Sequence, residues 1–293
     1  MSVGLSLATV AGALRYRFFL VAGIFPYLLG AAVAGRDGAT ADWWLLFVGL
    51  AGVLAVSAGI EGLNEYFDTL IGTDRVFELG QRPKAHWPLP VGISGFGVAF
   101  LIGIYLTCLR GWPILALMLF GGAAALSYLC PGVHLSYRGL GETVITISYG
   151  CGLTLGGYYL QAGGLSWSCV WASLLPALLI LAMTLANEVP DYHGSQLVGK
   201  RNIVVRLGRL GAAWAYCLVT ASAFLLLLAG LLSGIYPALL GWAFLLAPFA
   251  LVNSRAALRL YEAPVSFCRV IRGAMLQYVL ITLLAAVSYA WGG

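Results

Sequence analysis

Charge is scarce in this chain. Only 9% of its 293 residues carry a formal charge, whereas about a quarter of the residues do so in soluble domains. The mean hydropathy of +0.93 points the same way. These values exclude a water-soluble globular domain, and they exclude disordered, collagen-like, coiled-coil and nucleic-acid-binding proteins, whose sequences are polar or strictly periodic. The sequence is that of a polytopic membrane protein.

Metal-binding and disulfide patterns are also missing. The six cysteines contain no C-x-x-C pair, and the three histidines are far apart in the sequence. A structural zinc site needs such ligands at close and regular spacing. The sequence therefore predicts no zinc site, and the cysteines are expected to be small, buried, apolar residues.

Long apolar runs dominate what remains. A bilayer core about 30 Å thick needs roughly 20 apolar residues in a helix. Runs of this kind, separated by charged residues, proline or glycine, predict about nine transmembrane helices. The predicted spans are residues 16–36, 43–67, 91–110, 113–130, 141–160, 168–188, 211–232, 236–252 and 271–291.

The positions of the basic residues support this number of spans. With nine spans, the N-terminus and the loops after spans 2, 4, 6 and 8 lie on one side of the membrane. Fourteen of the sixteen Lys and Arg residues fall on that side, and only Arg36 and Arg110 fall on the other. Because basic residues accumulate on the cytoplasmic side, we expect a cytoplasmic N-terminus and an inner-membrane location. The longer polar loops, which are the expected place for chemistry, share that cytoplasmic side.

The pattern Asn-Glu-x-x-Asp occurs twice, at the ends of the second and sixth spans. The first copy runs from Asn64 to Asp68 and the second from Asn187 to Asp191. Seven of the eleven acidic residues lie in or near these two copies, at positions 61, 65, 68, 74, 78, 188 and 191. Residues four positions apart share one face of a helix. Two such faces would bring together oxygen ligands, which Mg²⁺ prefers. For any single acid, the alternative is solvation of a helix end or pairing with a loop arginine.

Basic residues follow both copies. Arg82 and Lys84 come after the first, Lys200 and Arg201 come after the second, and Arg138 lies between spans 4 and 5. Guanidinium and ammonium groups bind diphosphate oxygens well. Contact with lipid headgroups is the alternative for each of them.

The two copies lie 123 residues apart, and this offset covers four predicted helices. Spans 1–4 and 5–8 are therefore expected to be duplicated halves of one domain, residues 1–293, with span 9 added. Secondary transporters are built from such repeats, so a transporter that uses the acids for ion coupling is an alternative. The acids lie at helix ends on one side rather than near the middle of the membrane, and this favours an enzyme.

Four stretches together carry a resemblance to a known family. They are Asn64-x3-Asp68-x5-Asp74, Tyr137-Arg138-Gly139-Leu140-Gly141-Glu142, Asn187-Glu188-Val189-Pro190-Asp191-Tyr192, and Gly199-Lys200-Arg201 with Val205-Arg206-Leu207-Gly208. With them the chain resembles the UbiA-type intramembrane prenyltransferase superfamily over essentially its whole length. The forms Asn-Glu-Tyr-Phe-Asp and Gly-Leu-Gly-Glu are nearest the menaquinone branch, which prenylates 1,4-dihydroxy-2-naphthoate.

The resemblance implies an all-α fold around a central cavity, two Mg²⁺ ions, a polyprenyl diphosphate and a small aromatic acceptor. The catalytic residues that it implies are Asp68, Asp191, Arg138 and Lys200. The implied metal ligands are Asn64, Asp68, Asp74, Asn187, Glu188 and Asp191. The implied substrate-binding residues are Asn64, Arg82, Lys84, Tyr128, Tyr137, Asn187 and Arg201.

Loss of diphosphate from an allylic chain leaves a cation, which aromatic faces stabilise without attacking it. The aromatic residues expected to do so, from their place in the sequence, are Tyr66, Phe67, Tyr128, Tyr149, Tyr158 and Tyr159.

The sequence departs from the family pattern at two positions. Ser195 stands where relatives usually have a second Asp, four residues after Asp191, and Ser136 stands where many have Lys. The second metal site is therefore expected to carry less negative charge, with Glu188 or a water as a substitute ligand. Another acceptor, or cyclisation of the prenyl chain without an acceptor, is the alternative activity on the same scaffold.

Overall fold

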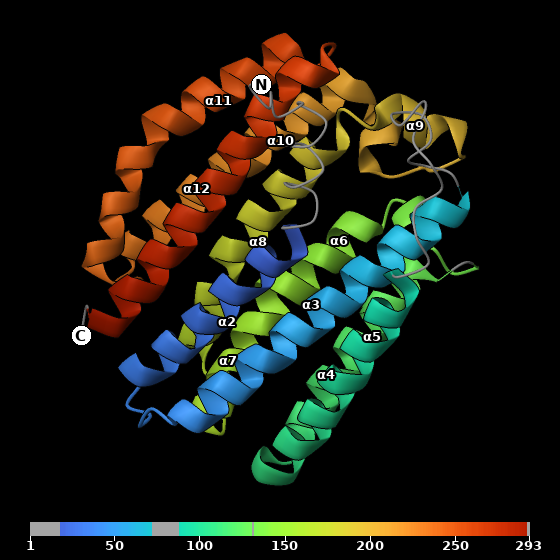
Figure 1. Ribbon diagram of the computed structural model, residues 1–293. Helices are drawn as coiled ribbons and strands as arrows, with labels where there is room; N and C mark the ends of the chain where they lie inside the picture. Colours follow the sequence, from blue (N-terminus) through green and yellow to red (C-terminus); the bar gives the residue numbers. More distant parts are fainter. Residues whose placement is uncertain (1–17, 72–87, 131, 292–293) are drawn as a thin grey trace, which may run out of the picture.

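A computed structural model describes residues 18–71, 88–130 and 132–291 (Figure 1). Within these residues every regular element is helical, which confirms the all-α prediction. The elements are α2 (Phe18–Arg36), α3 (Trp43–Ile71), α4 (Pro88–Arg110), α5 (Trp112–Leu129), η2 (Leu135–Tyr137), α6 (Gly141–Ile145), η3 (Thr146–Gly152), α7 (Leu153–Ala162), α8 (Trp167–Glu188), α9 (Tyr192–Leu197), α10 (Ile203–Leu232), η4 (Ala238–Leu246), α11 (Ala247–Leu260) and α12 (Pro264–Trp291).

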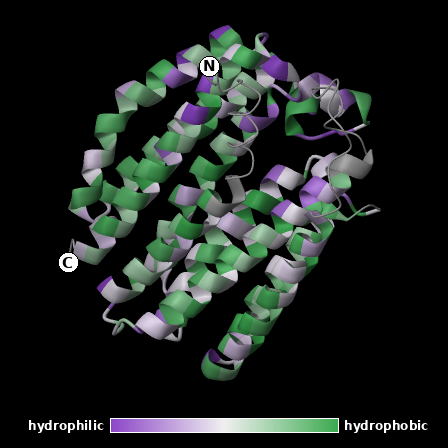
Figure 2. Cartoon of the chain, in the orientation of Figure 1, coloured by the Kyte–Doolittle hydropathy of each residue, from purple (hydrophilic) through white to green (hydrophobic). Residues whose placement is uncertain are grey.

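The helices match the predicted apolar spans closely. Within the described residues, seven helical segments are long and apolar enough to cross a membrane, and η4 and α11 together form one of them. The shorter helix α2 and the continuous rod of α6, η3 and α7 coincide with the first and fifth predicted spans. In Figure 2 the helical shafts are mostly hydrophobic, while hydrophilic residues gather toward the helix ends. The chain is thus an integral membrane protein built from a helical bundle.

Two helices begin earlier than predicted. α10 starts at Ile203 and α12 at Pro264, whereas the apolar runs begin only after Arg209 and near Arg272. A charged residue marks where a helix leaves the apolar layer, but it does not interrupt helical hydrogen bonding. In α10, a kink at Gly208 (φ 72°) separates the polar first turns from the apolar remainder.

The fifth predicted span contains a π-helix, η3, between α6 and α7. Its residue Gly150 packs directly against the backbone of Ala177 in α8, so closely that a Cβ atom on Gly150 would overlap the Ala177 Cα. π-Helical turns are rare, and they occur mostly where function requires a local change in a helix.

Helix α8 is the centre of the bundle. Most of its residues between Ala172 and Ala186 are buried, and it packs against α10, α12, α2 and η3. Helix α4, in contrast, turns large apolar side chains such as Phe100 and Leu101 outward. An exposed apolar surface of this kind suits contact with lipid.

Helix α4 is held to α3 by a seam of glycines. A Cβ atom on Gly95 would lie 2.6 Å from the Gly59 nitrogen, and one on Gly62 would lie 2.6 Å from the Gly92 nitrogen. Small residues let helix backbones approach closely, and van der Waals contact then holds the helices together within a bilayer. This seam fixes the position of α3, whose last turns carry the first acidic motif.

Candidate active site

The two acidic motifs end α3 and α8, and Figure 1 shows the ends of these helices at the same end of the bundle as α9. Short-range packing joins α5, α6 and η2 at this end, and α6 also contacts α8. The second motif, the connection between α5 and α6 and the loop before α10 are therefore neighbours in space, although they are far apart in the sequence.

The first motif is described only in part. Asn64 lies on α3 and is half-buried, and the rings of Tyr66 and Phe67 meet edge to face at 5.5 Å between their centroids. Asp68 belongs to the same helix, but its side chain lies outside the described residues, as do Asp74, Arg82 and Lys84. Their predicted roles in metal and diphosphate binding stay predictions.

The second motif lies where α8 gives way to α9. α8 ends at Glu188, and the nearby Pro190 has no N–H to continue the helical ladder. Asp191 then precedes α9, and its backbone oxygen accepts a hydrogen bond from the Ser195 N–H at 2.8 Å. Ser195 therefore lies one helical turn after Asp191, and its side chain is buried.

Glu188 is held in a polar network behind the second motif. Its Oε2 accepts a hydrogen bond from the Asn202 side-chain amide at 2.9 Å, and its Oε1 lies 4.0 Å from the Lys200 ammonium nitrogen. Lys200 and Glu188 are partly buried, with 20% and 14% of their side chains exposed. The network fixes Lys200 near the second motif, where we predicted a diphosphate-binding cation.

Glu142 joins the same region from α6. It is almost completely buried, and its Oε1 accepts a hydrogen bond of 2.6 Å from the backbone N–H of Ile203, the first residue of α10. A carboxylate suits the N-terminus of a helix because it faces the positive end of the helix dipole. Glu142 thus anchors the start of α10 and, with it, the loop that carries Lys200 and Arg201.

The loop before α6 is bound to the loop before α10. The Arg201 N–H donates to the Tyr137 carbonyl oxygen at 2.9 Å, and the Arg206 guanidinium donates to the carbonyl oxygens of Arg138 and Arg201. Gly139 lies at this junction with φ 74°, and a Cβ atom there would lie 2.9 Å from the Arg201 carbonyl oxygen. Both the backbone conformation and the close approach require glycine.

Three basic residues, of which Arg138 and Lys200 were predicted to be catalytic and Arg201 to bind substrate, therefore come together on two joined loops. Arg138 and Arg201 are exposed, and Lys200 is partly buried beside them in the sequence. The Arg138 guanidinium also donates to the Gly132 carbonyl oxygen at 2.8 Å, which holds it on its own loop. Tyr137, whose ring stacks on His134 at 4.4 Å, stiffens the same loop.

Tyr128 and Tyr149 line a narrow, mostly apolar cavity of about 30 Å³ between α3, α5 and the α6–η3 rod. Ile60 and Val144 also line it. Its walls match the apolar surroundings that we expected for a prenyl group and its cation. Among the described residues, this cavity is smaller than the central cavity that the resemblance implies.

Two of the predicted aromatic residues lie elsewhere. The Tyr158 hydroxyl donates to Asp37 at 2.9 Å, and the Tyr159 hydroxyl donates to the Arg110 carbonyl oxygen at 3.3 Å. Asp37 and Arg110 follow or end α2 and α4, at the opposite end of the bundle from the motifs. The prediction was wrong for these two tyrosines, because more than ten helical residues at 1.5 Å each separate them from the motif end of their span.

The donor set of the motifs fits Mg²⁺. Within the described residues, no three His, Cys, Asp or Glu side chains lie close enough together to hold a metal ion. The described motif residues Asn64, Asn187 and Asp191 nevertheless carry side-chain oxygen atoms, and hard divalent cations prefer oxygen ligands. The Glu188 carboxylate already pairs with Asn202 and Lys200, and these two side chains compete with a metal ion for its oxygen atoms.

Two residues of this region had no role in the sequence-based prediction. Asn202 is 1% exposed and caps α10, with its Oδ1 accepting from the Val205 N–H at 2.8 Å. An Asn directly before an apolar helix was a recognisable N-cap signal. Glu142 was part of a quoted motif, but no local pattern relates it to Ile203, 61 residues away in the sequence.

Comparison with known proteins gives consistent matches. Residues 23–276 match the UbiA prenyltransferase family. The chain is 28% identical over 287 residues to the 1,4-dihydroxy-2-naphthoate octaprenyltransferase of Escherichia coli (strain K12), and the alignment covers 88% of this chain and 90% of the relative. It is 24% identical over 202 residues to the enzyme of the same name from Bacillus subtilis (strain 168), where 66% of this chain aligns with 64% of the relative, just under two thirds of that protein.

The fold also matches a solved structure. A UbiA homologue from Archaeoglobus fulgidus, bound to GPP and Mg²⁺, superposes with a TM-score of 0.57 over 93% of this chain and 99% of that one, at 14% identity. The family match begins within α2 and ends within α12, so it includes both acidic motifs and the two loops that the hydrogen bonds join. The chain therefore belongs to the UbiA prenyltransferase family.

Proposed function

We propose that the protein transfers a polyprenyl group from a polyprenyl diphosphate to an aromatic quinone precursor such as 1,4-dihydroxy-2-naphthoate, with Mg²⁺ as cofactor. The observation that carries the proposal is the junction of the Arg138 and Arg201 loops beside the second acidic motif. Oxygen ligands and phosphate-binding cations are both needed to hold a diphosphate. The names of the relatives from Escherichia coli and Bacillus subtilis supply the acceptor.

The metal requirement is drawn from the donor set and from the Archaeoglobus fulgidus homologue, which binds GPP and Mg²⁺. We assign metal binding to the two motifs, through Asn64, Asp68, Asp74, Asn187 and Asp191, and two ions are proposed. Bound Mg²⁺ supplies charge neutralisation at the departing diphosphate. Glu188 holds Lys200 through its carboxylate, and we assign it the secondary role of a substitute ligand.

The protein groups then divide the remaining work. Arg138, Lys200 and Arg201, together with Arg82 and Lys84 of the first loop, bind and orient the diphosphate oxygens. The faces of Tyr128 and Tyr149 line the cavity in which the allylic cation forms, and the surrounding apolar helices keep water from attacking it. Tyr137 positions the Arg138 loop. The acceptor attacks C1 of the prenyl chain through its electron-rich ring carbon, which then loses its proton.

We also propose the topology that the basic residues predict. Nine spans, a cytoplasmic N-terminus and cytoplasmic motif loops put the diphosphate site at the cytoplasmic side of the inner membrane. The apolar prenyl chain lies within the bilayer, and this accounts for an enzyme that is itself embedded in the membrane. The whole chain, residues 1–293, acts as one domain made of two related halves.

A direct assay separates this proposal from its alternatives. Purified protein is incubated with radiolabelled geranylgeranyl diphosphate and Mg²⁺, with and without 1,4-dihydroxy-2-naphthoate. The proposal predicts diphosphate release and a labelled naphthoate product only when the acceptor is present. Release without acceptor, together with a cyclic hydrocarbon product, would identify a terpene cyclase on the same scaffold. No release under either condition, together with cation-coupled uptake into proteoliposomes, would identify a transporter.

A further inference from the structure

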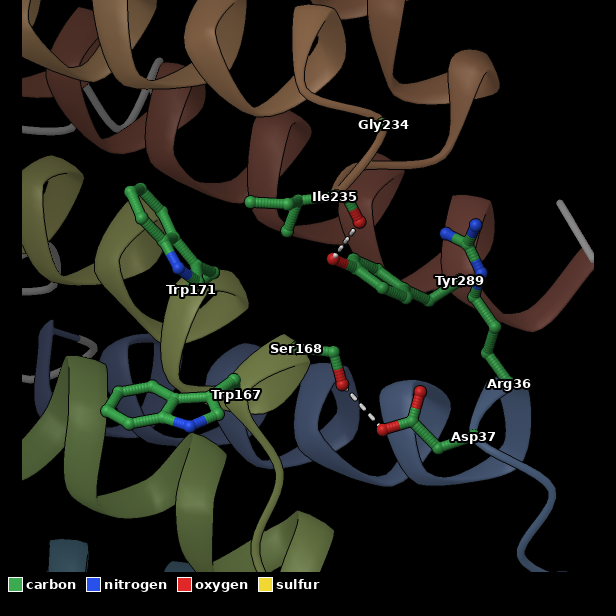
Figure 3. A pocket seen from close by; sticks show the side chains of 8 residues that line it. All are labelled: Arg36, Asp37, Trp167, Ser168, Trp171, Gly234, Ile235 and Tyr289. Carbon is green, nitrogen blue, oxygen red and sulfur yellow. Dashed lines mark hydrogen bonds between the residues drawn. The ribbon is translucent and has the colours of Figure 1, made fainter.

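A second pocket lies at the opposite end of the bundle from the acidic motifs (Figure 3). Its volume is about 340 Å³, and small-molecule sites typically occupy about 300–1,000 Å³. The end of α2, the start of α8, the turn between α10 and η4 and the end of α12 enclose it. The residues that line it are Arg36, Asp37, Trp167, Ser168, Trp171, Gly234, Ile235 and Tyr289.

One wall of this pocket carries a positive charge that is available to a ligand. The Arg36 guanidinium lies over the ring of the buried Tyr289, 5.3 Å from its centroid. This stacking holds the group in place and leaves its N–H donors unused, since within the described residues no hydrogen bond or ion pair joins them to a protein group. A stacked guanidinium with unused donors suits a phosphate.

The same wall carries a carboxylate. Oδ2 of Asp37 accepts hydrogen bonds from Tyr158 at 2.9 Å, Ser166 at 2.8 Å and Ser168 at 2.5 Å. Burial acts to raise the pKa of Asp37, but these hydrogen bonds and the nearby Arg36 charge outweigh it, and the pKa lies below its ordinary value. Figure 3 shows that the other carboxylate oxygen points away from Ser168, toward the side of the pocket where Tyr289 and Arg36 lie.

The opposite wall is aromatic. Trp167 and Trp171 lie one helical turn apart on α8, and Figure 3 shows their rings across the pocket from Arg36 and Asp37. Their exposed fractions are 79% and 37%, so both rings are accessible. Tryptophan rings favour the headgroup level of a bilayer, and their faces attract ammonium groups.

We propose that this pocket binds the headgroup of a phospholipid that carries both a phosphate and an ammonium group. The phosphate lies on Arg36, and the ammonium lies between Asp37 and the two indole rings. A ligand with only one sign of charge would be attracted to one of Arg36 and Asp37 and repelled by the other. A zwitterion can pair its phosphate with Arg36 and its ammonium group with Asp37. The exposed Leu232 lies in the sequence just before the pocket turn and offers apolar surface for an acyl chain.

The test uses the full-length protein, purified and delipidated in detergent, and native mass spectrometry to count bound lipids. Phosphatidylethanolamine and phosphatidylglycerol with the same acyl chains are titrated separately, and soluble phosphoethanolamine is titrated as a third probe. We expect phosphatidylethanolamine to bind about tenfold more tightly than either of the others. Asp37→Asn should remove this preference, because the amide still accepts the hydroxyl bonds but has lost its charge. Arg36→Gln should weaken binding of both lipids about tenfold.

Arg110→Gln is the matched control, since Arg110 ends α4 at the same end of the bundle but does not line the pocket. It should leave lipid binding unchanged. Should Asp37→Asn fail to fold, the comparison of Arg36→Gln with Arg110→Gln still decides the question. Equal binding of both lipids by the wild type, equal binding of soluble phosphoethanolamine, or equal losses in the Arg36 and Arg110 variants would each overturn the proposal. Prenyl transfer is measured separately, so its absence would not affect this result.

Discussion

The side-chain amide of Asn202 donates a hydrogen bond to Oε2 of Glu188 at 2.9 Å, and through it the end of α8 is fastened to the start of α10. The other end of the same amide accepts from the Val205 N–H. One buried side chain therefore caps a helix and holds the last residue of another. The loop between them carries Lys200, whose distance from the second acidic motif depends on this link.

Two substitutions of Asn202 keep its cap on α10 but remove its hydrogen bond to Glu188. Asn202→Asp keeps the oxygen that caps α10 but places an acceptor opposite Glu188, so the link between the helices is lost. We expect the KM for the prenyl diphosphate to rise about tenfold while kcat changes less. Asn202→Ser also retains a cap and loses the amide that donates to Glu188, but it adds no charge, so it separates the loss of the link from repulsion of Glu188. Equal KM values in both variants and the wild type would show that the link does not position Lys200.

Glu142 should stabilise the fold through the N-terminus of α10. Glu142→Ala removes the acceptor of the Ile203 N–H from a buried position, and we expect a loss of about 1–3 kcal/mol, seen as a lower Tm in detergent. Glu142→Gln keeps an acceptor oxygen and should retain most of the stability. A Glu142→Ala variant that is as stable as the wild type would argue that water replaces the lost acceptor.

Prenyl transfer should depend on one carboxylate from each motif. We expect Asp68→Ala and Asp191→Ala each to lower kcat/KM at least about a hundredfold, because Mg²⁺ binding weakens and the diphosphate charge is no longer neutralised. Turnover is measured at saturating Mg²⁺, and folding is checked by thermal unfolding. Glu262→Gln serves as the control, since Glu262 lies exposed in the turn before α12. Near-normal turnover in either Asp variant would rule out a site formed by both motifs.

Ser195 lies one helical turn after Asp191, so it is placed to test whether a ligand has been lost. Ser195→Asp would add a full charge and two acceptor oxygens beside Asp191. We expect the Mg²⁺ concentration for half activity to fall, with the choice of prenyl donor unchanged. Ser195→Asn is the control, because an Asn side chain has a shape similar to that of Asp but carries no negative charge. If Ser195→Asp needs the same or more Mg²⁺, Ser195 does not face the metal. That result would favour transfer to another acceptor, or a cyclase activity, over transfer to 1,4-dihydroxy-2-naphthoate.

Cysteine labelling tests the proposed topology. In a background without the six native cysteines, Gly80→Cys and Gln196→Cys should react with a membrane-impermeant maleimide only when the cytoplasmic side is accessible. Thr40→Cys, in the exposed loop between α2 and α3, should react from the other side. The reverse pattern would mean that the distribution of Lys and Arg does not set the orientation of this protein.

The helices could be predicted because each is a local property of the chain. An apolar run of roughly 20 residues cannot leave its backbone polar groups unpaired in a bilayer, so it forms a helix whatever surrounds it. The four-residue spacing of Asp191 and Ser195 likewise matches one helical turn, whereas the end of α8 separates Asn187 from Asp191. The contact of Glu142 with Ile203 could not be predicted in this way, because it depends on how α6 and α10 pack. The contacts of Tyr158 and Tyr159 could not be predicted either, because membership of a span does not say which end of the bundle a side chain lies near.

The π-helical segment Thr146–Gly152 lies in the middle of a span that contributes side chains to two separate sites. An extra residue within a turn rotates everything that follows by roughly 100° relative to an uninterrupted α-helix. Tyr149, before the end of that turn, lines the cavity near the motifs, while Tyr158, beyond it, reaches Asp37 beside the distant pocket. The residues before η3 and the residues after it therefore face different directions around the span. Deletion of a single residue in η3 would rotate the side chains after it, such as Tyr158, away from their present contacts.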